Sequence, residues 1–294
     1  MNNVRARAFI SVSGLGFAFA LIVCLGIFTS VPLPAAGPGR AECRSVPSKI
    51  LGYPVGYCVV LPSNYDTDKT AIYPVLYFLH GIGDNEQSLI KSGIMNLIQD
   101  LRDQQKIGEF LVATPDGDRT FYINSRDGEV RYEDFVIREF IPYIESHYRI
   151  RAERKSRGIT GISMGGYGAL RFGLLYPNLF IAASAHSAAL IEKLPPEFDS
   201  QTDTAFWQRE SPFTIVRKRP RPVGLQIYFD CGTDDDYGFN HGAQQFHDLL
   251  DAKGIPNEFH LYPGAHDWPY FAEHLPASLE FQSRAFGLTP ARGK

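Results

Sequence analysis

Short apolar runs alternate with amphipathic stretches along most of the chain. Residues 73–79 form a continuous apolar run, typical of a strand buried on both faces of a sheet. Residues 132–148 repeat apolar side chains at 132, 136, 140 and 144, the spacing of a helix that buries one face. The pattern predicts further strands at 109–114, 158–160, 180–185, 225–229 and 257–262, and further helices at 88–104, at 239–253 and in a C-terminal region broken at Pro276. This alternation predicts an α/β fold: one domain with a mostly parallel central sheet and helices on both faces.

Two segments depart from this alternation. Residues 43–51 and 55–61 predict an antiparallel hairpin that turns near Gly52 and opens the sheet. Residues 190–222 are rich in proline, carry Phe206 and Trp207, and show no clear period. Such an insertion forms either the wall of a binding pocket or a surface excursion with its own small core, and the sequence does not separate the two.

A complete G-x-S-x-G motif, Gly161-Ile-Ser163-Met-Gly165, lies between a β-prone run and a helical pattern that ends at Pro177. A strand that turns sharply into a helix around a serine holds that serine in a strained conformation, with its hydroxyl clear of the sheet. Any side chain at Gly161 or Gly165 would collide with the crossing strand and helix. The motif predicts a nucleophilic Ser163 beside a helix N-terminus, where free N–H groups favour a developing oxyanion; a chance match in a Gly/Ser-rich turn is the alternative.

A glycine-rich loop, His80-Gly-Ile-Gly83, follows the apolar run 73–79. In folds with this serine turn, that loop supplies one backbone N–H to the oxyanion, and the residue after the serine supplies the other. We therefore expect Ile82 or Gly81 as one donor and Met164 as the second. His80 itself is expected to be buried at its strand end and to hold the loop.

A nucleophilic serine needs a base, and the base needs an acid that orients it. Imidazole suits the role of base because it takes and returns a proton near neutral pH. Of the eight histidines, only His266 follows the last expected strand in a glycine-rich turn from which it can reach Ser163. The order serine, acid, histidine places the acid in segment 230–236. The candidates are Asp230, Asp234, Asp235 and Asp236, among which spacing alone does not choose.

Composition excludes several other chemistries. With 294 residues and a formal net charge of −3, the chain shows no basic face for nucleic acid, and no nucleic-acid partner is expected. The basic run 217–221 is expected to be a solvated loop before a strand. The chain has neither H-E-x-x-H nor a paired C-x-x-C, and its glycines fit neither a P-loop nor a dinucleotide fingerprint, so no metal and no cofactor are expected. The sequence gives no indication of oligomeric state.

The first residues have the order of a secretory signal. Arg5 and Arg7 precede an apolar run at 8–28, and small residues and prolines follow. We expect residues 1–41 to be a signal peptide and short linker, or an uncleaved N-terminal anchor that would be the chain's contact with a membrane. Residues 42–294 are expected to be the exported domain, secreted or periplasmic.

The cysteines bear on that compartment. Cys43 and Cys58 flank the expected hairpin and could form a disulfide in an oxidising compartment. A regular hairpin that turns near Gly52 would not place them directly opposite each other, so the sequence leaves the bond open. Cys231 would then be unpaired.

Four motifs together resemble the esterase D-like branch of the α/β-hydrolases. They are Ser-Met-Gly-Gly-Tyr-Gly-Ala at 163–169, Tyr-Glu-Asp-Phe-Val-Ile-Arg-Glu-Phe-Ile-Pro-Tyr at 132–143, Cys-Gly-Thr-Asp-Asp at 231–235 and Gly-Ala-His-Asp-Trp at 264–268. The branch includes the feruloyl and acetylxylan esterases of carbohydrate esterase family one, S-formylglutathione hydrolases and mycolyltransferases. The resemblance covers about residues 45–285. It implies that Asp235 is the acid, and that Ile82 and Met164 are the oxyanion donors.

The expected function is therefore that of a secreted serine carboxylic-ester hydrolase with an acyl-enzyme intermediate. Ser163 would be the nucleophile, His266 the base and Asp235 the acid, with acyl or feruloyl esters of carbohydrates, or small-molecule esters, as candidate substrates. One alternative is an acyltransferase of the mycolyltransferase type, in which a sugar hydroxyl replaces water. The other is a non-catalytic binding protein on the same fold.

Overall fold

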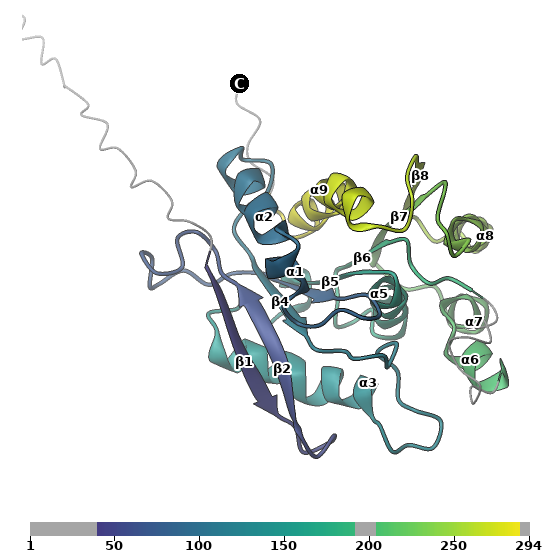
Figure 1. Ribbon diagram of the computed structural model, residues 1–294, viewed down its shortest axis with the longest axis horizontal. Coiled ribbons are helices and arrows are strands. Elements are labelled where there is room, and N and C mark those ends of the chain that lie inside the picture. The colour runs from purple at the N-terminus through teal and green to yellow at the C-terminus, as the bar shows by residue number, and fades with distance from the viewer. Residues whose placement is uncertain (1–39, 192–203, 289–294) are drawn as a thin grey trace, which may run out of the picture. The chain divides into compact units, whose positions relative to one another are not determined.

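An eight-stranded sheet forms the centre of residues 40–191 and 204–288, which the computed structural model describes (Figure 1). The strand order is β1-β2-β4-β3-β5-β6-β7-β8. Strand β2 runs antiparallel to β1 and β4, and all other neighbours are parallel. The strands are β1 Ala41–Pro47, β2 Pro54–Val60, β3 Val75–Leu79, β4 Leu111–Pro115, β5 Arg157–Ile162, β6 Ala182–His186, β7 Gln226–Gly232 and β8 Glu258–Tyr262.

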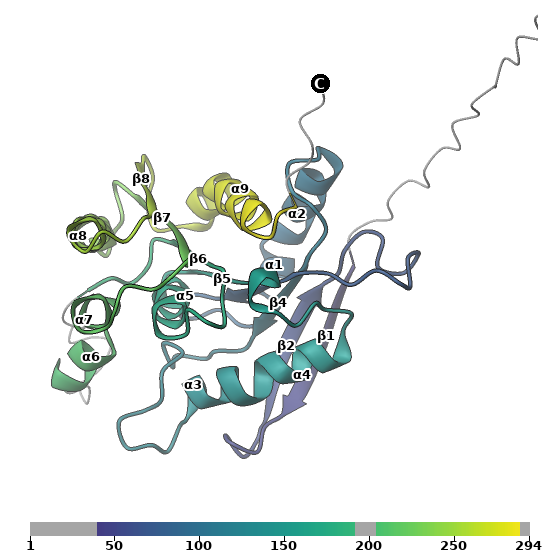
Figure 2. The ribbon, with the colours of Figure 1, turned by 180° about the vertical axis from the view of Figure 1, so that it is seen from behind.

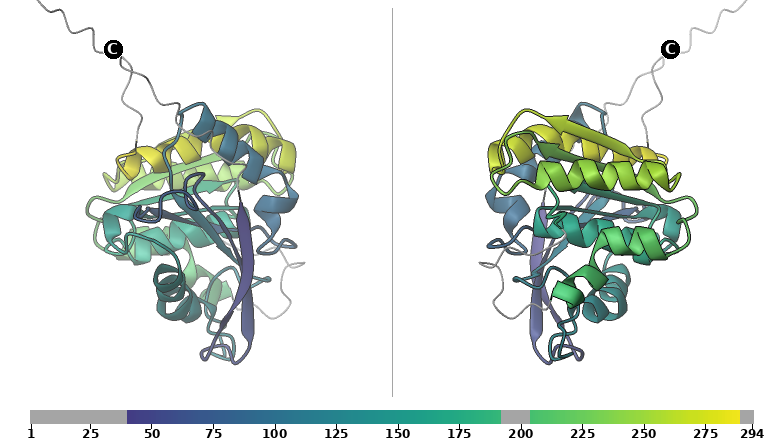
Figure 3. Two further views of the ribbon diagram at one scale, coloured as in Figure 1. Left: turned by 90° about the vertical axis from the view of Figure 1, so that its left-hand side faces the viewer. Right: turned by 90° about the vertical axis from the view of Figure 1, so that its right-hand side faces the viewer.

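Helices cover both faces of this sheet, as Figures 2 and 3 show. One face packs against α1 (Ser88–Lys91), α2 (Ile94–Asp103) and α9 (Trp268–Ala285). The other packs against α3 (Tyr132–Phe135), the π-helical turn η1 (Val136–Phe140), α4 (Ile141–His147), α5 (Met164–Leu175), α6 (Thr204–Glu210), α7 (Pro212–Lys218) and α8 (Phe239–Ala252). A short 3₁₀ turn, η2 (Arg154–Ser156), leads into β5. Every residue of β3, β4, β5 and β6 is buried, because parallel strands in the middle of such a sheet meet helices on both sides.

Two helices differ from the sequence-based prediction. The helix expected at 88–104 is two helices, because Gly93 between them has a left-handed backbone (φ 80°) that breaks the helical path. The C-terminal helix expected to break at Pro276 instead continues through it. Leu275 and Leu279, on either side of the proline, are both buried against the sheet, and this packing outweighs the hydrogen bond that proline cannot make.

The N-terminal hairpin has a different register from the one predicted. Gly52 lies in the turn, as predicted, and its N–H donates to the carbonyl of Ser48, but the turn is centred between Ile50 and Leu51, which places Cys43 directly opposite Cys58. A contact far away in the chain holds this turn: the Glu139 carboxylate accepts hydrogen bonds from the Ser48 hydroxyl and from the backbone N–H groups of residues 49 and 50.

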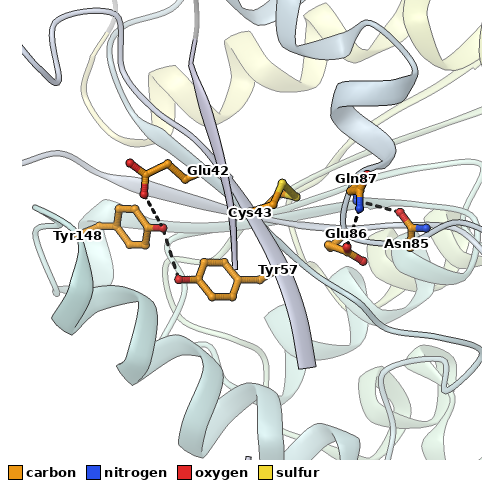
Figure 4. The surroundings of a disulfide bond; sticks show 8 residues. Glu42, Cys43, Tyr57, Asn85, Glu86, Gln87 and Tyr148 are labelled. Atoms are coloured by element: carbon orange, nitrogen blue, oxygen red, sulfur yellow. Dashed lines mark hydrogen bonds between the residues drawn. A yellow bond between two sulfur atoms is a disulfide. The ribbon is translucent and has the colours of Figure 1, made fainter. Parts of the chain in front are cut away.

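The register allows a disulfide between Cys43 and Cys58, which the structure contains (Figure 4). Beside it, Tyr148 donates a hydrogen bond from its hydroxyl to the carboxylate of Glu42 on β1. The remaining cysteine of the described residues, Cys231, is free and buried. Strand β1 is therefore joined covalently to β2 at the edge of the sheet.

The expected signal or anchor at 1–41 falls almost entirely on residues 1–39, which lie outside the described residues. Within the described part, no helix is both long enough and apolar enough to cross a bilayer.

Candidate active site

Ser163 lies at a tight turn between β5 and α5, as the motif predicts. Its backbone has φ 55° and ψ −117°, a conformation that a residue with a side chain adopts only under strain. A methyl group added at Gly161 would lie 2.3 Å from the backbone of Gly165, and one added at Gly165 would lie 1.9 Å from the carbonyl oxygen of Leu79. Glycine at both positions is thus a steric requirement of the crossing between strand and helix.

His266 and Asp235 form a hydrogen-bonded pair beyond the ends of β8 and β7. The distance between His266 Nδ1 and Asp235 Oδ2 is 2.7 Å. The other carboxylate oxygen accepts hydrogen bonds from the backbone N–H groups of Tyr237 and Phe239. An ionised carboxylate only accepts, so Nδ1 carries the proton and Nε2 is left with its lone pair for base chemistry.

The electrostatics of Asp235 favour that ionised form. Burial acts to raise the pKa of this carboxyl, but the hydrogen bond and charge of His266 and the two backbone N–H donors outweigh it, so the pKa lies below its usual value. The side chain of Asp235 is fully buried and that of His266 is 9% exposed. The pair is therefore held in one orientation and largely shielded from solvent.

One cavity of about 230 Å³ brings together Ser163, His266, Ile82 and Met164. Met164 is the first residue of α5, where backbone N–H groups have no acceptor within the helix. Among the residues that the structure describes, neither the N–H of Met164 nor that of Ile82 donates a hydrogen bond. Both predicted oxyanion donors thus line the same cavity as the nucleophile, with their N–H groups available.

His80 is fully buried and fastens the loop that carries Ile82, as predicted. The backbone N–H of Gly117 donates to His80 Nε2 at 2.7 Å, so Nε2 is the acceptor nitrogen. The protonated nitrogen must then be Nδ1, which donates to the carbonyl oxygen of Gly81 at 2.8 Å. The hydroxyl of Tyr122 donates to the carbonyl of His80 itself. This histidine is a structural clamp and does not line the cavity.

Of the four candidate acids, the structure brings only Asp235 to His266. Asp234 and Asp236 flank it and are exposed. Asp230 is buried on β7, where it accepts hydrogen bonds from the hydroxyls of Tyr228 and Tyr270.

Asp230 also pairs with a histidine that the sequence reasoning missed. His186 Nδ1 lies 2.9 Å from Asp230 Oδ2, and its Nε2 lies 2.7 Å from Ser278 Oγ. The carbonyl oxygen of His186 accepts the backbone N–H of Ser163 at 2.9 Å. His186 ends β6 next to the strand that carries the nucleophile, and its place at a strand end is the signal that could have identified it.

The described part of segment 190–222 meets the cavity at its first residues and packs beside it through aromatic rings. Ile191 lines the cavity, and its carbonyl accepts a hydrogen bond from the indole N–H of Trp207. Trp207 stacks on Tyr167 with ring centroids 4.7 Å apart, and Phe121 meets both rings edge-on. Residues 192–203 of the predicted insertion, with Phe198, lie outside the described residues.

Known esterases are similar to this chain in sequence. The family model described as "Putative esterase" matches residues 48–281. An esterase of Mycobacterium tuberculosis is 29% identical over 248 residues, which cover 74% of this chain and 53% of that protein. An acetyl esterase of Caldicellulosiruptor saccharolyticus is 28% identical over 231 residues, which cover 71% of this chain and 83% of the relative. The chain thus spans about half the length of the mycobacterial relative.

Solved structures share the fold. A ferulic acid esterase aligns with a TM-score of 0.76 and 28% identity, over 85% of this chain and 99% of that one. A ferulic acid esterase of Anaeromyces mucronatus, solved in complex with ferulic acid, aligns with a TM-score of 0.69 and 20% identity, over 86% of this chain and 94% of that one. The predicted fold and the resemblance to feruloyl esterases and related hydrolases are confirmed.

Proposed function

This chain belongs to the esterase family, and we propose that it hydrolyses carboxylic esters through an acyl-enzyme on Ser163. One observation carries the proposal: a strained serine and a histidine oriented by a buried aspartate line the same cavity. A serine hydroxyl is a weak nucleophile until a base takes its proton, and the lone pair on His266 Nε2 is that base.

In the proposed reaction, Ser163 Oγ attacks the ester carbonyl carbon while its proton passes to His266 Nε2. The carbonyl oxygen becomes an oxyanion that accepts hydrogen bonds from the N–H groups of Ile82 and Met164. The negative charge of Asp235 stabilises the imidazolium, which then gives its proton to the departing alcohol oxygen as the C–O bond breaks. Water repeats the same steps on the acyl-enzyme and releases the acid.

The lining of the cavity supports substrates with an apolar or aromatic acyl group. Phe121, Tyr237, Phe239, Trp268 and Phe271 all contribute to it. Three of these rings also meet the imidazole of His266 edge-on, with centroids 4.9 to 5.4 Å away. Together with the likeness to ferulic acid esterases and an acetyl esterase, this lining supports acyl or feruloyl esters of carbohydrates as substrates.

We further propose that the domain acts outside the cytoplasm, secreted, periplasmic or held by its N-terminal segment. The disulfide between Cys43 and Cys58 supports this, because such bonds persist in oxidising compartments. The signal-like order of charged, apolar and small residues at the N-terminus supports it as well.

Hydrolysis of p-nitrophenyl acetate tests the proposal. The wild type should release p-nitrophenol and label with a fluorophosphonate, and Ser163→Ala should lose both while remaining folded. Ser146→Ala, an exposed serine on α4, is the matched control and should behave as the wild type. Equal rates in the wild type and Ser163→Ala would disprove the serine mechanism. Product analysis with a sugar acceptor separates hydrolysis from acyl transfer, because only a transferase would form a new ester.

A further inference from the structure

A second and larger cavity lies on the same side of the sheet as Ser163. It has a volume of about 480 Å³ and is bounded by α5, α6, α7 and the loop at 124–126. We call it the basic cavity; its charged lining consists of Arg126, Arg171, Arg209, Lys218 and Arg219, with Glu133 and Glu210 as the two acids. Cavities of roughly 300–1,000 Å³ are the usual size for small-molecule sites, so this one is large enough to hold a ligand.

Glu133 and Glu210 both form ion pairs with Arg171 at the floor of this cavity. Arg171 is buried, with Nη1 2.7 Å from the carboxylate of Glu133 and Nη2 in contact with that of Glu210. Tyr176 also donates its hydroxyl to Glu133. Both carboxylates are thus held in place, and Glu210 also forms an ion pair with Arg209 on the rim.

The rim is positively charged. Arg126, Arg209, Lys218 and Arg219 are exposed around the opening. Arg209 lies 3.3 Å from Glu210, but within the described ranges no carboxylate lies within ion-pair distance of Lys218 or Arg219. Leaving Arg126 aside, the charged lining residues sum to +2 in a chain whose formal charge is −3, so positive charge gathers at this cavity against the overall balance.

This location corrects one prediction from the sequence. The run 217–221 was expected to be a solvated loop before a strand; it is exposed and residues 219–221 lie in such a loop, but the first two residues belong to α7, and Lys218 and Arg219 line the cavity. The last turn of α7 and Arg209 on α6 therefore place cations that are distant in the sequence around one opening.

A shared loop and neighbouring aromatic rings connect the lining of the basic cavity with that of the catalytic one. Phe121 lines the catalytic cavity, and residues 124–126 of the same loop line the basic cavity. Behind Phe121, Trp207 lies 5.0 Å away between ring centroids, and its neighbour Phe206 lines the basic cavity. A substrate that reaches both cavities must therefore extend beyond its ester, as an oligosaccharide does.

We propose that the basic cavity binds an anionic group on a sugar of the ester's alcohol part, a carboxylate or a phosphate, while the ester bond lies at Ser163. This inference rests on the proposed function. Guanidinium groups match both anions, because their parallel N–H donors form paired hydrogen bonds with two oxygens. The substrate class is thus acyl esters of acidic saccharides rather than of neutral ones.

Calorimetric titration of the full-length protein with three sugars tests the proposal. The probes are trigalacturonic acid, the neutral trisaccharide of galactose, and galactose 6-phosphate. Either acidic sugar should bind about tenfold or more tightly than the neutral one, the gain expected from one charge-assisted hydrogen bond, and the difference should shrink with added salt. Binding of trigalacturonic acid would identify the anion as a carboxylate, and binding of galactose 6-phosphate would identify it as a phosphate. Equal binding of all three overturns the proposal.

Variants locate the binding. Arg209→Ala/Lys218→Ala should lose about tenfold in affinity for the acidic sugar and leave p-nitrophenyl acetate hydrolysis unchanged, because that substrate does not reach the rim. Lys106→Ala, an exposed lysine after α2 on the opposite face of the sheet, should change neither. An equal loss in Lys106→Ala would overturn the assignment.

The two proposals fail separately. A wild type that binds acidic sugar but leaves p-nitrophenyl acetate intact contradicts only the esterase mechanism. A wild type that hydrolyses the ester but binds acidic and neutral sugars equally contradicts only the basic cavity.

Discussion

Replacing Gly165 by alanine tests whether the close crossing of strand and helix sets the position of Ser163. The new methyl group would lie 1.9 Å from the carbonyl oxygen of Leu79 and 2.7 Å from that of His80. Both obstacles are backbone atoms, so no side-chain rotation relieves the contact. Because such contacts are essentially never shorter than 3.0 Å, α5 must withdraw from β3 by more than 1 Å.

We expect this withdrawal to affect both stability and catalysis. Forcing a methyl group into a packed site lowers the free energy of unfolding by about 1–3 kcal/mol. Met164, directly before the substituted residue, moves with the helix and carries the proposed oxyanion donor. A misplacement of about 1 Å at a reacting group costs on the order of 100-fold in rate, so kcat/KM for p-nitrophenyl acetate should fall by about that factor.

Urea denaturation followed by circular dichroism measures the first effect, and initial rates on the folded protein measure the second. Gly56→Ala on β2 is the matched control, since its methyl group would meet only the Glu86 side chain, 3.1 Å away, which can rotate. This variant should keep wild-type activity. If Gly165→Ala keeps wild-type stability and kcat/KM as well, the crossing does not position the nucleophile, and the steric reasoning is refuted.

Three further predictions follow from the acid and from the disulfide. Asp235→Asn should lower kcat for p-nitrophenyl acetate by about 10⁴-fold with little change in KM, because His266 loses the carboxylate that keeps its proton on Nδ1. A decrease in kcat of less than tenfold would contradict the role of Asp235. The lowered pKa of Asp235 makes its contribution to stability complete above about pH 4 and progressively lost as the pH falls towards the folded-state value. The urea midpoint of the wild type should therefore fall more steeply below pH 4 than that of Asp235→Asn, and parallel curves would count against this linkage. Cys43→Ser/Cys58→Ser should lower the free energy of unfolding by about 3 kcal/mol, measured by urea denaturation, for a closed loop of this length. It should leave kcat/KM unchanged, so a large loss of activity in the folded variant would show that the hairpin supports the catalytic cavity.

The sequence predicted best the features whose causes are local. The turn around Ser163 needs only two glycines, a strand and a helix within about twenty residues, and the structure has all of them in place. The alternation of strands and helices was likewise sufficient to predict the parallel part of the sheet. The identity of the acid was different: spacing left four aspartates open, and only the resemblance to a family selected Asp235.

The features that the sequence did not predict depend on distant contacts. The hairpin register is held by Glu139, about ninety residues further along the chain, and nothing near Gly52 reveals it. Helix α9 continues through Pro276 because the sheet packs against both halves, and local propensity cannot anticipate that packing. His186 escaped notice because its partners Asp230 and Ser278 lie on elements far along the chain, so no local motif marks it.

The covalent link at the sheet edge has a mechanical consequence. Any force that pulls on the chain before residue 40 enters the domain through β1, which is an edge strand. Without a covalent link, the hydrogen bonds between β1 and β2 would break one after another under such a force. The bond between Cys43 and Cys58 stops that peeling at the third residue of β1, so the load passes into β2 and the sheet. Since β2, β4 and β3 stand between β1 and β5, a tether at this end could bear tension without shifting Ser163.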